Sequence, residues 1–140
     1  MQLQKIKVDA LKLSDIKNPS EQKIHGHEEI DTIICSAREY GFKSVFLDKK
    51  QWYSIRISSG LLPKLKYLAI YEVSPVSAIR WAGKIEKIEK YEGGPKYILY
   101  LSEIFQVGPV KADSQKFAPQ GSRFTCFDIL STATKISEIF

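Results

Sequence analysis

The 140-residue chain is poor in the side chains that build metal sites and disulfide frameworks. It has two cysteines, Cys35 and Cys126, and two histidines, His25 and His27. Two distant cysteines cannot form a zinc site alone, so we expect reduced, buried thiols and a cytoplasmic location. A metal at the His25-Gly26-His27 pair is disfavoured because no cluster of further cysteines or histidines follows it. We therefore expect no metal and no cofactor.

Other signals are missing as well. No apolar run approaches the roughly 20 residues that span a bilayer, and the N-terminal MQLQKIKVDALKL lacks the apolar centre of a signal peptide, so no membrane partner is expected. There is no GxSxG or cysteine–histidine signature of a nucleophilic enzyme. Gly93-Gly94 precedes Pro95 in a predicted hairpin turn, so it is not a phosphate-binding loop. These absences favour binding over catalysis.

The composition is that of one globular domain. Hydrophobic residues make up 44% of the chain and charged residues 26%. We expect a single domain over residues 1–140, in which 1–27 is a poorly defined N-terminal segment. Lysine and arginine number 21 against 16 acidic residues, and the net charge of +5 favours a polyanionic partner such as nucleic acid. The same charge spread evenly would do no more than keep the protein soluble.

The hydrophobic periodicity predicts one helix followed by a sheet. Ile30, Ile33, Ile34 and Ala37 have helical spacing, which predicts a helix over 27–40 that ends at Gly41. A period of two then predicts strands, a hairpin turn lies at 92–95, and short helical turns end the chain. The strands are expected at 44–48, 52–58, 66–73, 76–88, 96–104 and 123–127, and the helical turns at 129–140. The fold class is α+β: a small, curved, mostly antiparallel sheet of five or six strands, resembling a β-barrel and flanked by short helices.

The stretch from Gln51 to Ile88 carries both tryptophans and two arginines. Alternation places Trp52 and Arg56 on one face of their strand, and Tyr53 with the neighbouring isoleucines on the core face. Aromatic rings beside arginines suit stacking of a base and anchoring of a phosphate. For Trp52, such a platform and a cap on the sheet edge under the helix are equally plausible.

The strand at 76–88 contains the second tryptophan. Ile79, Trp81 and Gly83 share a predicted face with Ile85, which favours core packing for Trp81. Gly83 suits a bulge or a close approach by another backbone or a ligand.

The order of a helix, FKSVFL, QWYSIRI, KYLAIYEVSP, AIRWAGKIEKIEKY, GPKYILYL and PQGSRFTCFDILSTATKISEIF resembles the PUA-like superfamily, which includes the EVE, YTH and ASCH domains. The resemblance covers roughly residues 28–140 and rests on element order. It implies a small barrel-like sheet with flanking helices that binds RNA or DNA. Several members hold a flipped-out or modified base in an aromatic pocket, and by that resemblance Trp52, Tyr71 and Trp81 are the candidate pocket walls.

The leading hypothesis is a noncatalytic nucleic-acid-binding domain that holds a base, including a modified one, in this aromatic pocket. Basic side chains would contact the phosphate backbone. The candidates for those contacts are Arg56, Arg80, Arg123, Lys49, Lys50, Lys64 and Lys66.

Two alternatives stay open. One is a small enzyme of the ASCH type that processes RNA or nucleosides, with Glu72 or Lys84 as candidate catalytic groups. The other is a specificity or interaction module, with a partner protein, in a restriction or defence system. The sequence leaves open DNA or RNA, the preferred base, the oligomeric state and whether the chain is part of a longer protein.

Overall fold

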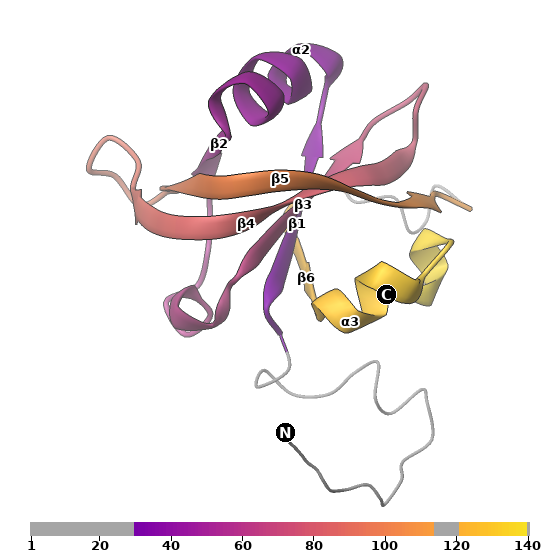
Figure 1. Ribbon diagram of the computed structural model, residues 1–140. Coiled ribbons are helices and arrows are strands. Elements are labelled where there is room, and N and C mark those ends of the chain that lie inside the picture. The colour runs from indigo at the N-terminus through magenta and orange to yellow at the C-terminus, as the bar shows by residue number, and fades with distance from the viewer. Residues whose placement is uncertain (1–29, 114–120, 140) are drawn as a thin grey trace, which may run out of the picture.

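A single curled sheet dominates the computed structural model, which describes residues 30–113 and 121–139. Six strands follow one another across the sheet in the order β2-β5-β4-β3-β1-β6. β1 runs parallel to β3, and the other neighbouring pairs are antiparallel. The half-barrel that results (Figure 1) confirms the predicted α+β class. The strands are β1 (Thr32–Ala37), β2 (Gln51–Ile55), β3 (Tyr67–Glu72), β4 (Ala78–Lys90), β5 (Tyr97–Lys111) and β6 (Arg123–Thr125).

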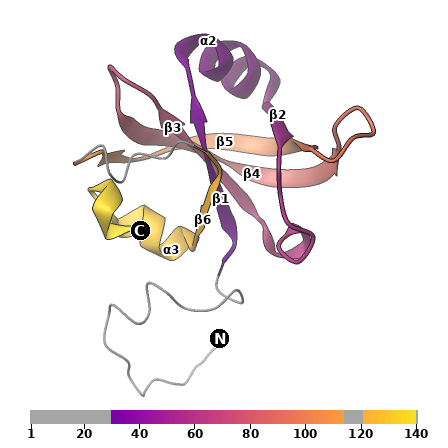
Figure 2. The same ribbon diagram turned by 180° about the vertical axis from the view of Figure 1, so that it is seen from behind.

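Short helices cover the sheet on both sides. On one side α2 (Glu39–Gly41) continues directly as a π-helical segment, Phe42–Leu47. On the other side lies α3 (Phe127–Thr132), followed by a 3-10 turn at Ile136–Glu138. Figures 1 and 2 show α2 and α3 on opposite sides of the strands. The predicted helical turns at the end of the chain are thus confirmed.

The sheet separates two hydrophobic cores, because successive side chains of a strand point to opposite faces. The first core lies under α2 and contains Phe42, Phe46, Leu68 and Ile70. The second lies under α3 and contains Ala69, Tyr71, Ile79, Val110 and Leu130. β3 contributes alternately to both.

The helix predicted at 27–40 is wrong over Thr32–Ala37, and the helical segment of the structure begins only at Glu39. Thr32–Ala37 is strand β1, which lies between β3 and β6 and is almost entirely buried. A central strand buried on both faces has apolar residues at consecutive positions instead of alternating ones, so Ile33, Ile34 and Ala37 also match a helical repeat. Parallel pairing with β3, from Thr32 opposite Tyr67 to Ala37 opposite Glu72, settles the strand.

The strand predicted at 44–48 is also wrong, because this segment belongs to the helix. Phe42, Val45 and Phe46 are buried, and their spacing of three and four residues places them on one helical face. Gly41, expected as a helix C-cap, lies inside the helical segment with φ of −63° and ψ of −39°. Packing of this face against the first core decides the helix.

The later strands confirm the predicted elements with shifted ends. β5 extends to Lys111 into the predicted loop, and β2 ends at Ile55 instead of 58. Gly83 makes the predicted close approach to another backbone: a Cβ there would lie 3.1 Å from the carbonyl oxygen of Glu103 on β5. None of the described helices is long and apolar enough to cross a membrane. The 1–27 segment with His25 and His27 lies outside the described residues.

Candidate functional site

The site begins with an irregularity in β4 at Arg80. In the pairing of β3 with β4, Ile70 lies opposite Trp81 and Tyr71 lies opposite Ile79, so Arg80 is an extra, bulged residue. The bulge moves the preceding and following side chains to opposite faces. Ile79 packs in the second core and Trp81 against the first, so the face predicted for Ile79 and Trp81 together is wrong.

Arg80 is bound to the last residue of β3. Its Nε donates a hydrogen bond of 2.9 Å to Glu72 Oε2, and its Nη2 donates one of 2.7 Å to Oε1. The Glu72 side chain is 8% exposed and that of Arg80 48%. The hydrogen bonds to Glu72, and then its charge, raise the pKa of Arg80. The more exposed guanidinium of Arg80 therefore neutralises and orients the buried carboxylate of Glu72.

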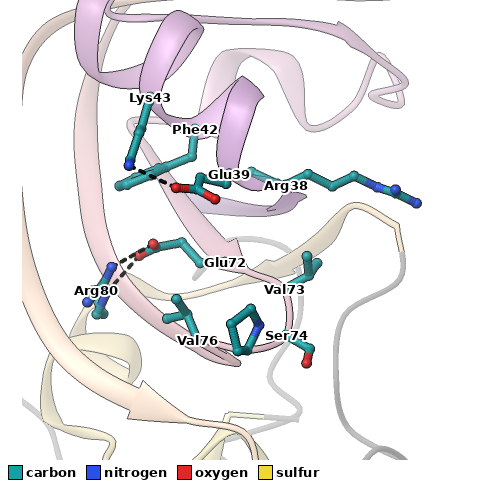
Figure 3. Close-up of a pocket in the computed structure, with 11 residues that line it drawn as sticks. Arg38, Glu39, Phe42, Lys43, Glu72, Val73, Ser74, Val76 and Arg80 are labelled. Atoms are coloured by element: carbon teal, nitrogen blue, oxygen red, sulfur yellow. Dashed lines mark hydrogen bonds and ion pairs between the residues drawn. The ribbon is translucent and has the colours of Figure 1, made fainter.

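This pair lies at one side of a pocket of about 580 Å³ between α2 and the β3–β4 turn. Figure 3 shows α2 on one side of the pocket and the turn residues Val73, Ser74 and Val76 on the other. The helix contributes polar side chains and the ring of Phe42. The full lining is Ala37, Arg38, Glu39, Phe42, Lys43, Glu72, Val73, Ser74, Pro75, Val76 and Arg80.

The pocket is electrostatically mixed with a cationic excess. Arg38, Lys43 and Arg80 contribute three positive charges, against two negative charges from Glu39 and Glu72. Lys43 Nζ lies 2.8 Å from Glu39 Oε2, one helical turn away. Hydrogen bonding within this pair raises the pKa of Lys43 and lowers that of Glu39. Such a pocket can take an anionic ligand with a polar edge and an apolar face.

Arg80 also lines a second, smaller hollow of about 330 Å³. Its other walls come from β5, at Gln106, Val107, Gly108 and Pro109. Here β5 has extra residues opposite the Arg80 bulge, because Ile79 lies opposite Val110 and Trp81 opposite Gln106. The two irregularities together give the Arg80 guanidinium access to both hollows.

Trp52 lies apart from this pocket and is half-buried against the first core. A Cβ at Gly41 would lie 3.3 Å from Trp52 Cη2, so the indole packs directly under the helix. The face predicted for Trp52 together with Arg56 is wrong. A register irregularity between Trp52 and Ile55, with a φ of 65° at Ser54, changes the alternation. Tyr53 and Arg56 are exposed, whereas Tyr53 was expected in the core.

The three aromatics expected as pocket walls do not form one wall. Trp81 packs against the first core, as Trp52 does, and Tyr71 is buried in the second core with 4% of its surface exposed. Glu72 alternates with Tyr71 and belongs to the pocket on the α2 side.

The predicted basic residues are dispersed, apart from Arg80. Arg56 follows the edge strand β2, and Arg123 begins the opposite edge strand β6. Lysines 49 and 50 precede β2, Lys64 ends a 3-10 turn at Leu62–Lys64, and Lys66 precedes β3. Of these six residues Lys64 is half-exposed, and the others are exposed.

The sequence reasoning missed Arg38, Glu39 and Lys43 as pocket residues, because it placed a helix end and a strand there. One signal could have found them. Glu39 and Lys43 are four residues apart with the glutamate first, which is the favoured arrangement for an ion pair on a helix. That spacing predicts a helix starting near 39, with both side chains on one face.

Within the described ranges no three histidine, cysteine, aspartate or glutamate side chains cluster as metal ligands. Of the two candidate catalytic residues, Glu72 faces the pocket and Lys84 does not line it. Lys84 lies opposite Tyr67, at the other end of β3 from Glu72, which is roughly 17 Å along the strand.

Comparison with solved structures identifies the same architecture in another protein. A mutant form of the ASCH protein from Zymomonas mobilis superposes with a TM-score of 0.52 at 16% identity, covering 69% of this chain and 89% of that one. A second structure of the ASCH protein from this organism gives 0.49 at 15% identity, covering 71% and 88%. No family model and no curated protein matches the sequence. The chain has the fold of an ASCH-type, PUA-like domain, as the resemblance predicted.

Proposed function

We propose that this chain is a nucleic-acid-binding domain that receives a base in the pocket between α2 and the β3–β4 turn. The observation that carries the proposal is the Glu72 carboxylate, which is buried beside this pocket and accepts two hydrogen bonds from the Arg80 guanidinium. The ASCH-type fold and the net charge of +5 support a polyanionic partner.

The chemistry of the pocket suits a nucleobase. Its volume of about 580 Å³ lies within the usual range of roughly 300–1,000 Å³ for ligand sites. Phe42 and Val76 offer apolar surface to the faces of a ring. Each carboxylate oxygen of Glu72 accepts one bond from Arg80 and has a further lone pair for the amino group of cytosine or adenine.

The cations around the pocket suit the phosphates next to that base. Glu72 takes two of the five N–H donors of Arg80, so the guanidinium can also bind a phosphate oxygen in the second hollow. Arg38 is exposed at the start of α2. In this proposal Arg56, Arg123 and the lysines at 49, 50, 64 and 66 add weaker contacts along the backbone, whereas Trp52 and Trp81 pack against the first core and do not line the pocket.

The test is binding of mononucleotides by calorimetry. We expect 5′-CMP or 5′-AMP to bind more tightly than 5′-UMP, since uracil offers no amino group to Glu72. Glu72→Gln should remove this preference, because an amide oxygen is a weaker acceptor and its NH2 cannot accept. Glu103→Gln, at an exposed residue of β5 outside the pocket, is the matched control. Equal binding of all mononucleotides by wild type and Glu72→Gln would refute the base pocket.

Hydrolysis of RNA or nucleosides is a second candidate function. The observation that favours it is the presence of Lys43 and Glu72 in the same pocket, because a buried carboxylate and an amine there could serve as proton-transfer groups. Turnover of oligonucleotides or nucleosides that disappears in both Glu72→Gln and Lys43→Met would establish it. Binding without turnover by the wild type would leave the noncatalytic function.

A further inference from the structure

A group of tyrosines lies at the end of β4 that is distant from the pocket. Tyr53 of β2 and Tyr91 after β4 stack with ring centroids 5.3 Å apart and planes inclined by 9°. Tyr53 is 43% exposed, although it is a large aromatic residue. Neither ring belongs to either core cluster. The interior of the protein therefore does not account for this pair.

A third ring, that of Tyr100, lies on β5, the strand that pairs with both β2 and β4. Lys87 Nζ lies 4.8 Å from the ring centroid of Tyr100. Gln51 is opposite Tyr100, and Tyr100 is opposite Lys87, so the three side chains share one face of the sheet. The adjacent Leu99 and Ile88 pack in the first core, which places Tyr100 and Lys87 on the opposite, outer face. Tyr53, Tyr91 and Tyr100 together are called the tyrosine platform below.

The charge around the platform is positive. The segments that carry the rings, 48–53 and 87–100, contain five lysines and three acidic residues. One of the acidic residues, Glu89, is paired with Lys87 at 3.3 Å. The residues are Lys49, Lys50, Lys87, Lys90 and Lys96 against Asp48, Glu89 and Glu92. Rings with a lysine excess complement a strand that presents flat bases and phosphates in alternation.

We propose that the tyrosine platform binds single-stranded nucleic acid by stacking bases on the exposed ring of Tyr53 and the partly exposed rings of Tyr91 and Tyr100, with the lysines on the phosphates. Sequence reasoning did not include these tyrosines in the site, because Tyr53 was expected in the core. The inference rests on the proposed nucleic-acid binding, but it does not require the Glu72 pocket. From Arg80 to Lys90 the strand β4 spans roughly 33 Å, so platform and pocket are separate contacts. In Figure 1 the β4–β5 and β3–β4 turns lie at opposite ends of the sheet.

The test compares an oligonucleotide with a mononucleotide. The affinity for fluorescently labelled ten-nucleotide single strands, rC10 and dC10, is measured by fluorescence anisotropy for wild type, Tyr53→Ala and Tyr53→Phe. Stacking by one ring corresponds to roughly a 5- to 150-fold change in affinity. We expect Tyr53→Ala to weaken oligonucleotide binding by at least about fivefold, with 5′-CMP binding unchanged. Tyr53→Phe retains the ring and should bind as the wild type does.

The outcomes separate this inference from the proposed function. Tyr53→Ala with unchanged oligonucleotide affinity and a lowered Tm would make the tyrosine pair a brace for the β4–β5 turn and overturn the platform. The pocket proposal would survive that result. If the wild type binds neither oligonucleotide nor mononucleotide at low salt, both proposals fail. A stronger effect of Tyr53→Ala on a duplex of the same length than on the single strands would also contradict the platform, since paired bases cannot stack on it.

Discussion

Arg80 holds Glu72 by two hydrogen bonds of 2.9 and 2.7 Å across adjacent antiparallel strands. The bulge in β4 makes this contact possible, because it takes Arg80 out of the regular alternation. The pair joins two structural roles: it neutralises a buried carboxylate, and it places a guanidinium between two hollows.

Removal of Arg80 should destabilise the protein. In Arg80→Ala the Glu72 carboxylate loses the two hydrogen bonds from Arg80 while staying buried, which costs about 1–3 kcal/mol of unfolding free energy. Arg80→Lys should recover part of this loss, since lysine supplies the charge without the planar fork. Urea unfolding at pH 7 measures both.

Arg56→Ala is the matched control for this prediction, because Arg56 is exposed at the sheet edge. A change within about 0.5 kcal/mol is expected there. If Arg80→Ala and Arg56→Ala have the same stability, the Glu72 contact contributes nothing measurable to the fold.

Gly41 should be sensitive to side-chain size. Its backbone is ordinary helix, so alanine is conformationally favourable by about 1 kcal/mol over glycine. A Cβ, however, comes within 3.3 Å of Trp52 Cη2, and the extra methyl groups of valine cannot be accommodated without moving the indole. We expect Gly41→Val to shift tryptophan emission to longer wavelength and to cost about 1–3 kcal/mol.

The emission is best followed in a Trp81→Phe background, where Trp52 is the remaining tryptophan. Gly60→Ala serves as the control, because a Cβ at Gly60 meets nothing within 4 Å. An unshifted spectrum in Gly41→Val would show that Trp52 does not pack against the helix.

The buried thiol of Cys35 should make stability fall at alkaline pH. Burial raises its pKa from the ordinary value of 9.0 to about 12, although a hydrogen bond with Ser122 opposes this. Above pH 9 the unfolded chain releases this proton while the folded protein retains it, so unfolding becomes more favourable up to about pH 12. The contribution is at most about 1.4 kcal/mol per pH unit.

Urea unfolding at pH 8, 9.5 and 10.5 tests this for wild type and Cys35→Ala. The wild type should lose stability more steeply with pH than the variant, since the two proteins differ only in the Cys35 thiol. Parallel curves would mean that the Cys35 thiol is accessible to ionisation in the folded state.

Periodicity and turn signals predicted the three central strands β3, β4 and β5. β3, β4 and β5 were found because their residues alternate or are β-rich and are separated by the turn signals Ser74-Pro75 and Gly93-Gly94-Pro95. A helix was predicted where β1 lies, and a strand was predicted within the helical segment at 39–47. The reason is that a fully buried strand and a buried helix face have the same apolar composition over six residues.

The sequence by itself determined the α+β class, the resemblance to the PUA-like superfamily and the cationic character of the chain, because periodicity, element order and charge are local or additive properties. The tertiary structure decided which side chains meet. The irregularity at Ser54 accompanies an exposed Tyr53 where a core residue was expected, and the bulge at Arg80 places Ile79 on the face opposite to Trp81. Pairing with β3 decided that Thr32–Ala37 is a strand. A one-residue bulge reverses the alternation of all that follows, and its position depends on the neighbouring strand. The pocket of Glu72, Arg80 and Lys43 therefore exists only in the folded sheet.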